Sequence, residues 1–168
     1  MQSGGDVLYL DFDGVLHPDA VFWSRKRGPY LDRPMLRFGH KLFEHCALLE
    51  ELLEPYPSVR IVLSTSWVKV YDYSGARKRL SAGLKARCIG ATWHSAMDAT
   101  AFERLERGEQ VMCDVRRRRP SAWIALGDKR LGWEQADSAC VVFTVEVQGI
   151  SAPEVHDQLR VTLRQRFS

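Results

Sequence analysis

Short runs of apolar residues recur along the chain and are separated by longer segments in which apolar residues return every three or four positions. The runs are too short for helices and are bounded by glycine, proline or charged residues, which favours buried strands. Five strands are predicted, at residues 7–10, 59–63, 87–91, 122–126 and 140–144.

The segments between these runs show helical spacing. In one of them Phe43, Ala47 and Leu48 are spaced to share a helical face, and Pro55 and Pro57 end the helix. Helices are predicted at residues 35–53, 72–85, 107–119 and 152–166. Strands that alternate with helices indicate a doubly wound, Rossmann-like α/β fold, in which a parallel sheet carries helices on both faces.

Two segments do not fit this alternation. Residues 1–6 are small, polar and glycine-rich, so we expect a frayed or disordered start, or a remnant that does not belong to the domain. Residues 17–34 mix three prolines and Gly28 with three consecutive basic residues, which predicts an irregular flap, without a long helix or strand, over the end of the first strand.

Composition narrows the classes of function. A chain of 168 residues that is 45% hydrophobic suits one domain, residues 1–168. It has no run of eighteen apolar residues and no signal-like start, so we expect a cytoplasmic protein without a membrane partner. Its four cysteines form no Cys-x-x-Cys pair, which argues against a zinc site. The net charge of +3 permits an anionic substrate but does not by itself imply nucleic acid.

The first strand ends in two carboxylates, Asp11 and Asp13, followed by Gly14. Residues i and i+2 of an extended chain point to the same side, so both carboxylates can converge on one ligand. Two negative charges this close are most easily maintained by a divalent cation. Gly14 lets the backbone turn and approach that ligand closely.

Polar side chains follow two other predicted strands. Ser64, Thr65 and Ser66 come after the second strand, and Asp128 comes after the fourth. In a doubly wound sheet, ligands bind at the carboxyl ends of the strands, near the reversal of strand order. The sequence therefore predicts one site that gathers these hydroxyl and carboxylate groups.

These motifs resemble those of the haloacid-dehalogenase-like (HAD) hydrolases. The first motif is matched by Asp11-Phe12-Asp13-Gly14-Val15-Leu16, the second by Ile61-Val62-Leu63-Ser64-Thr65-Ser66-Trp67, and the fourth by Trp123-Ile124-Ala125-Leu126-Gly127-Asp128. The pattern is most similar to the small HAD domains associated with RNA-repair proteins. Large HAD proteins insert a cap domain after the first or second motif; the intervals here are short, so an essentially capless, open site is expected.

The resemblance implies a role for each motif residue. Asp11 would be the nucleophile that forms an aspartyl-phosphate, and Asp13 the general acid and base. Ser64 would bind a phosphoryl oxygen, with Thr65 and Ser66 as competitors or as caps of the next segment. Mg²⁺ would be bound by Asp11, the backbone carbonyl of Asp13, and Asp128.

Several assignments stay open. Gly14, Thr65 and His17 are candidates for contact with substrate, and a structural role competes for His17. The third motif requires a cation that balances the anionic site: Arg107 is preferred, with Arg104 and Lys129 as alternatives. Many relatives carry two adjacent acids at the fourth motif, whereas this chain has Gly127-Asp128-Lys129. Glu134 or Asp137 could supply the second acid, or it is absent.

The predicted function is that of a Mg²⁺-dependent phosphohydrolase acting on a phosphorylated substrate, such as a nucleotide or a phosphorylated nucleic-acid end. The alternative is a catalytically weak module that binds nucleic acid or protein. The arginine run 116–119 fits either a solvated helix end or a contact with phosphates of nucleic acid. The sequence predicts no oligomeric state.

Overall fold

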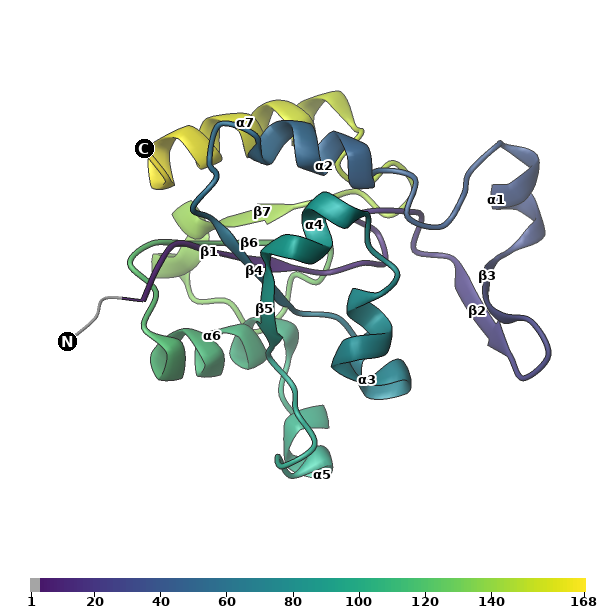
Figure 1. The fold of residues 1–168 in the computed structure, drawn as a ribbon, viewed down its shortest axis with the longest axis horizontal. Coiled ribbons are helices and arrows are strands. Elements are labelled where there is room, and N and C mark those ends of the chain that lie inside the picture. Colours follow the sequence, from purple (N-terminus) through teal and green to yellow (C-terminus); the bar gives the residue numbers. More distant parts are fainter. Residues whose placement is uncertain (1–3) are drawn as a thin grey trace.

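The computed structural model describes residues 4–168 and is built on a five-stranded sheet (Figure 1). Neighbouring strands all pair in parallel, in the spatial order β5-β4-β1-β6-β7. The strands are β1 (Val7–Leu10), β4 (Arg60–Leu63), β5 (Cys88–Ala91), β6 (Trp123–Gly127) and β7 (Val141–Phe143). The chain first builds from β1 to one edge and then returns to build the other, so the strand order reverses beside β1. The predicted doubly wound parallel sheet is confirmed.

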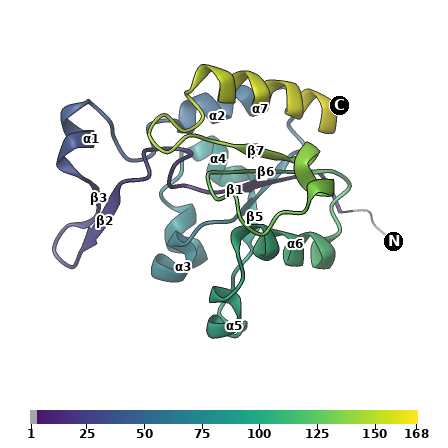
Figure 2. The same cartoon turned by 180° about the vertical axis from the view of Figure 1, so that it is seen from behind.

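Helices cover both faces of this sheet (Figures 1 and 2). One face carries α2 (Cys46–Leu53), α4 (Ala82–Arg87) and α7 (Pro153–Arg166), and the other carries α6 (Arg107–Arg118). Alternate residues of β1 serve the two faces, because Leu8 and Leu10 belong to the larger core whereas Val7 and Tyr9 pack with Val111 of α6. The central strand is thus buried on both sides, as a doubly wound sheet requires.

The start of the domain differs from the prediction for residues 1–6. Residues 1–3 lie outside the described range. Gly4, however, forms a β-bridge with Pro120, and its carbonyl accepts a hydrogen bond from the backbone N–H of Ser121 at 2.5 Å. Backbone pairing of this kind is available to any small residue, so composition alone did not reveal it.

The segment predicted as an irregular flap contains regular structure. Strands β2 (Val21–Ser24) and β3 (Gly28–Leu31) form an antiparallel hairpin, and α1 (Arg33–Arg37) follows it. Pro29 is tolerated in β3 because a two-stranded ribbon has only edge strands. The segment has no long helix or strand, as predicted, but it is a short hairpin and helix and not an irregular chain. Figures 1 and 2 show the hairpin projecting from the body at the end where α3 (Trp67–Arg77) lies.

Two predicted helices are divided by backbone breaks. The segment 35–53 contains only the end of α1 and the whole of α2, with Phe43 between them at a φ of 58°. The segment 72–85 contains the end of α3 and the start of α4, and α3 itself is interrupted at Asp72, with a φ of 58°. The Asp72 carboxylate accepts the Gly75 backbone N–H at 2.7 Å and so caps the continuation of α3. Helical spacing persists across such breaks, which is why it overestimated the lengths.

Among residues 4–168, no helix combines the length and the apolar character that a membrane crossing requires.

The arginine run at the end of α6 is partly engaged inside the protein. Asp114, which is 1% exposed, accepts hydrogen bonds from the Tyr9 hydroxyl at 2.7 Å, from Arg118 at 2.8 and 3.1 Å, and from Arg117 at 2.6 Å. Burial alone would raise the pKa of Asp114, but these donors bring it below its ordinary value. Two of the four arginines therefore pair with Asp114 of their own helix, and Asp114 in turn connects α6 to the central strand through Tyr9. Neither earlier alternative for the arginine run included this role.

Replacing Asp114 with Asn is expected to lower the free energy of unfolding by about 2–3 kcal/mol, because it leaves two guanidinium groups without their buried anion. The lowered pKa means that this contribution is complete above the ordinary carboxyl pKa of about 4 and disappears as the pH falls below it. Urea unfolding at pH 7 and pH 3 measures both effects. Tyr9→Phe, which removes one neutral donor, should cost about 1 kcal/mol. An equal difference between wild type and Asp114→Asn at both pH values would contradict this account.

Candidate active site

The carboxyl ends of β1, β4 and β6 meet at one edge of the sheet. The Ser64 backbone N–H donates to the Leu10 carbonyl at 2.8 Å, and the Asp11 backbone N–H donates to the Leu126 carbonyl at 3.1 Å. The hydrogen bonds of the parallel sheet thus continue one residue beyond β1 and β4, and they fix Asp11 between the ends of β4 and β6. Asp11 follows the strand beside which the strand order reverses, the expected place for a ligand.

Asp11 is enclosed and paired with a cation. Its Oδ2 lies 2.8 Å from Arg107 Nη1, and its Oδ1 accepts the Phe12 backbone N–H at 2.8 Å. The residue is 4% exposed. Burial raises the pKa of the Asp11 carboxyl, and the charge of Arg107 opposes this shift. The site therefore contains a desolvated carboxylate whose charge is balanced by one guanidinium group.

Arg107 is placed by the start of α6, of which it is the first residue. The side chains of Glu106 and Glu109 form a capping box around this helix start, and Arg107 also donates to the Ser64 carbonyl. Of the three cations considered for the third motif, Arg107 is the one in contact with Asp11. Arg104 ends α5 (Ala99–Glu103) instead, and Lys129 pairs with Asp128 at 3.5 Å.

Asp13 is oriented by two donors on one oxygen. Its Oδ1 accepts the indole N–H of Trp67 at 2.9 Å and lies 2.8 Å from His17 Nε2. His17 Nδ1 accepts the Phe43 backbone N–H at 3.1 Å, so His17 is the neutral tautomer that carries its proton on Nε2 and donates it to Asp13. The left-handed backbone at Phe43 thus helps to aim the catalytic candidate Asp13.

The positions of His17 and Thr65 revise two sequence-based expectations. His17 is fully buried behind Asp13, so it positions that carboxylate and does not line the open site. The Thr65 hydroxyl accepts the Trp67 backbone N–H at 3.3 Å and caps the start of α3. Within residues 4–168 the Ser64 hydroxyl has no hydrogen-bond partner, which leaves it available to a ligand at the same edge.

Asp128 packs directly against the turn at Gly14. A Cβ atom at position 14 would lie 2.7 Å from the Asp128 Cγ, and Gly14 has a φ of 74°. The Gly14 carbonyl accepts a hydrogen bond from the Thr144 hydroxyl at 2.5 Å, which ties this turn to the end of β7. Gly14 is therefore required both by backbone conformation and by the approach of Asp128.

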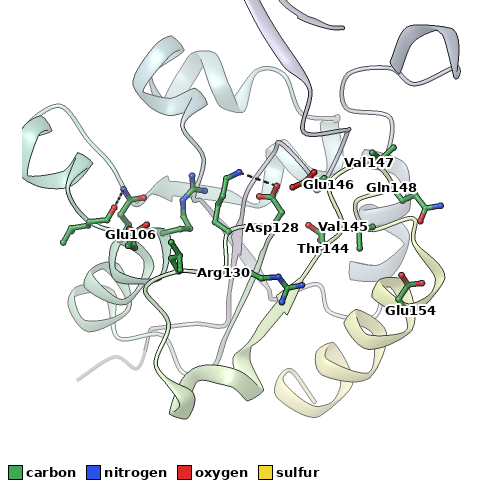
Figure 3. Close-up of a pocket in the computed structure, with 14 residues that line it drawn as sticks. Glu106, Asp128, Arg130, Thr144, Val145, Glu146, Val147, Gln148 and Glu154 are labelled. Carbon is green, nitrogen blue, oxygen red and sulfur yellow. Dashed lines mark hydrogen bonds and ion pairs between the residues drawn. The ribbon is translucent and has the colours of Figure 1, made fainter. Parts of the chain in front are cut away.

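A cleft of about 1130 Å³ opens beside these residues (Figure 3). Its lining includes Arg107, Asp128 and Lys129, together with Thr144 and Glu146, which follow β7. Its volume slightly exceeds the range of roughly 300–1,000 Å³ that is typical of small-molecule sites. A bulky phosphate ester can therefore reach this edge of the sheet.

The sequence model of one protein family, described as the HAD domain in Swiss Army Knife RNA repair proteins, matches residues 7–155. The match includes all five parallel strands and the strand ends that carry Asp11, Ser64 and Asp128. The chain belongs to this family. No curated protein and no solved structure gives a significant match. Membership confirms the resemblance seen in the motifs and supports hydrolase chemistry at the level of the HAD superfamily.

Two carboxylate oxygens of this HAD domain are suited to a cation. Asp128 Oδ1 is buried without a hydrogen-bond partner within residues 4–168, and the buried Asp11 Oδ2 is paired with the Arg107 guanidinium alone. Burial and the charge of Asp11 raise the pKa of Asp128 to about 7. In the described part of the chain, no group of three or more His, Cys, Asp or Glu side chains is placed to hold a metal. Two carboxylates, a backbone carbonyl, water and substrate phosphate are nevertheless a usual set of ligands for Mg²⁺.

One acid close to Asp128, Asp19, was not found from the sequence. Asp19 Oδ2 lies 3.1 Å from Lys129 Nζ, which also pairs with Asp128, and Asp19 contributes to the raised pKa of Asp128. Glu134 and Asp137, the two acids considered earlier, instead cap the 3₁₀ helix η1 (Gln135–Cys140). Asp19 lies in the predicted flap, and only the path of that segment brings it back to the sheet edge.

Replacing Gly14 with Ala is expected to displace Asp128 and to reduce turnover by about 10²-fold, the usual scale for a 1 Å misplacement of a catalytic group. Gly39→Ala is a matched control, because Gly39 also has a positive φ, 86°, but no neighbour within 4 Å of an added Cβ. Both variants should lose about 1 kcal/mol of stability from backbone strain. Kinetics and thermal unfolding, each with and without Mg²⁺, distinguish the loss of turnover from the loss of stability. Equal losses of turnover in the two variants would contradict the proposed packing role.

Proposed function

We propose that the chain is a Mg²⁺-dependent phosphohydrolase that cleaves phosphoric monoesters through an aspartyl-phosphate at Asp11. The observation that carries this proposal is the pair of carboxylates at the end of the central strand. One, Asp11, is buried against Arg107; the other, Asp13, is fixed by Trp67 and His17. The two aspartates thus have different surroundings, which suit them to different chemical roles.

In the first step an oxygen of Asp11 forms a bond to phosphorus while the bond to the ester oxygen breaks. Protonated Asp13 gives its proton to that leaving oxygen. In the second step ionised Asp13 takes a proton from water, whose oxygen bonds to phosphorus as the bond to Asp11 breaks. Inorganic phosphate is released, and Asp11 returns as a carboxylate.

Charge balance is the main contribution of the other residues. Arg107 neutralises Asp11 in the resting site, and its remaining N–H groups can donate to phosphoryl oxygens. The Ser64 hydroxyl can donate to another of these oxygens. Asp11, the backbone carbonyl of Asp13, and Asp128 would hold Mg²⁺, which supplies positive charge for the phosphoryl group when bound.

The substrates we propose are nucleotides or phosphorylated nucleic-acid ends. The open cleft favours a bulky ester, and the basic residues Lys129 and Arg130 on its wall favour an anionic one. The family description names RNA-repair proteins, which is consistent with a phosphorylated RNA end. The alternative, a catalytically weak binding module, was motivated by an uncertain third-motif cation and a missing second acid; Arg107 and Asp19 reduce both concerns.

Hydrolysis of p-nitrophenyl phosphate, adenosine 5′-monophosphate and 3′- or 5′-phosphorylated oligonucleotides, each with Mg²⁺ or with EDTA, tests this proposal. We expect turnover of at least one of these esters in Mg²⁺ and its loss in EDTA. Asp157→Asn, an exposed carboxylate on α7, is the control and should behave as wild type. The absence of metal-dependent turnover for all these esters, together with salt-sensitive binding of oligonucleotides, would favour the binding module instead.

A further inference from the structure

A second depression lies next to Asp13, between the β2–β3 hairpin and α3. Its volume is about 140 Å³, and its lining includes Asp13, Val21, Trp23, Pro29, Val70 and Tyr71. The large cleft described above does not include Asp13. We call this second depression the hairpin groove.

The hairpin groove exposes aromatic and apolar side chains. Cross-strand pairing of Trp23 with Pro29 and of Val21 with Leu31 places these residues on one face of the hairpin. Trp23 is 57% exposed, and Val70, on the α3 side, is 63% exposed. Exposed apolar side chains grouped beside a functional carboxylate are a typical feature of a ligand site.

A cation borders the groove on the α3 side. The Arg79 guanidinium lies over the rings of two lining residues, Tyr71, at 4.8 Å from its centroid, and Trp67, at 5.8 Å. A groove of aromatic rings bordered by a guanidinium group is complementary to a planar aromatic ligand that carries negative charge.

We propose that the hairpin groove binds the base of the nucleotide whose phosphate is cleaved, with Trp23 as its stacking surface. This proposal rests on the proposed function, because Asp13 at the groove is the group that protonates the leaving oxygen there. The volume is well below the roughly 300–1,000 Å³ of drug-sized sites, so the groove suits a single ring system. Phosphotyrosine is the competing aromatic ester; Arg79 beside the groove favours a nucleotide at the end of an oligonucleotide, whose neighbouring phosphate it can contact.

The kinetic test compares esters that differ in the base. Adenosine 5′-monophosphate and ribose 5-phosphate carry the same phosphate, but only the former has a base. The preference for the nucleotide is the ratio of its kcat/KM to that of ribose 5-phosphate. Stacking of a base on one aromatic side chain changes affinity by about 5- to 150-fold, so Trp23→Ala should lower this ratio by that factor. Trp23→Phe should restore most of it. Phe38→Ala, which removes an aromatic residue that is 78% exposed outside the groove, should leave the ratio unchanged.

A binding test makes the result independent of turnover. In the Asp11→Asn background, equilibrium dialysis should show tighter binding of adenosine 5′-monophosphate than of ribose 5-phosphate, and Trp23→Ala should abolish the difference. A phosphorylated oligonucleotide, as a second arm, distinguishes a nucleic-acid end from a free nucleotide. If binding depends on the base but the wild-type protein hydrolyses none of these esters, the base site in the hairpin groove is supported and only the proposed hydrolase function is contradicted. Either of two results would overturn the proposal. In one, Trp23→Ala keeps the wild-type preference for the nucleotide over ribose 5-phosphate; in the other, the protein prefers O-phosphotyrosine to every nucleotide.

Discussion

Replacing Asp11 with Asn is expected to reduce metal-dependent phosphate ester hydrolysis by about 10⁴-fold or more, the scale seen when a catalytic nucleophile is removed. The amide nitrogen and carbonyl of Asn cannot form the aspartyl-phosphate on which the proposed reaction depends. The fold should remain, because Asn has nearly the same shape as Asp and its side-chain carbonyl can still accept the hydrogen bond from the Phe12 backbone N–H. Initial rates with p-nitrophenyl phosphate and circular dichroism of the same preparation measure both expectations.

The matched control for this change is again Asp157→Asn, which makes the same chemical replacement on an exposed part of α7. Its rate should equal that of the wild type. A folded Asp11→Asn protein with more than about one tenth of the wild-type rate would rule out Asp11 as the nucleophile. Loss of rate together with loss of the circular dichroism spectrum would instead show that Asn is not tolerated, and Asp11→Ser would then be the second variant.

Replacing Asp128 with Asn should have opposite effects on stability and on function. The raised pKa means that the folded protein takes up a proton at Asp128 more readily than the unfolded chain does. In EDTA, the wild-type free energy of unfolding should therefore fall as the pH rises from about 4 to about 7, by an amount on the order of 4 kcal/mol, and then stay constant. Asp128→Asn should remove this dependence and unfold at a higher temperature at pH 8.

Mg²⁺ should reverse this order of stabilities. A ligand that binds only the folded state stabilises it by about 2.7 kcal/mol at a hundred times its Kd, so Mg²⁺ should raise the unfolding temperature of the wild type. In Asp128→Asn the response to Mg²⁺ and the turnover should both be lost. Thermal unfolding at pH 5 and pH 8, with Mg²⁺ or EDTA, measures these changes. An equal rise with Mg²⁺ in both proteins would show that Asp128 does not bind the metal.

The strands and the strand-end residues were the parts that the sequence predicted well. Short apolar runs that end in carboxylates or hydroxyls are a local pattern, and a parallel sheet converts this pattern into spatial proximity at one edge. Asp11, Ser64 and Asp128 therefore come together, because each directly follows the last residue of a strand. Arg107 depended on the family pattern, since nothing in its own surroundings indicates that the helix start faces Asp11.

The parts that could not be predicted depend on contacts between distant segments. Pro29 and Gly28 indicate a turn, but the hairpin also needs the pairing of Phe22 with Tyr30, which no periodicity signals in so short a strand. Helix breaks at Phe43 and Asp72 require left-handed backbone at residues that are not glycine. The Phe43 break is used in the site, because its N–H determines the tautomer of His17.

The most direct test of Asp11 as the nucleophile is to detect the phosphorylated intermediate. Wild-type protein mixed with p-nitrophenyl phosphate and Mg²⁺ is quenched in acid at successive times, and its peptides are analysed by mass spectrometry. The account predicts a transient phosphoryl group on the peptide that contains Asp11, and none in Asp11→Asn. Phosphate on another residue, or turnover that continues in Asp11→Asn without any phosphorylated peptide, would contradict it.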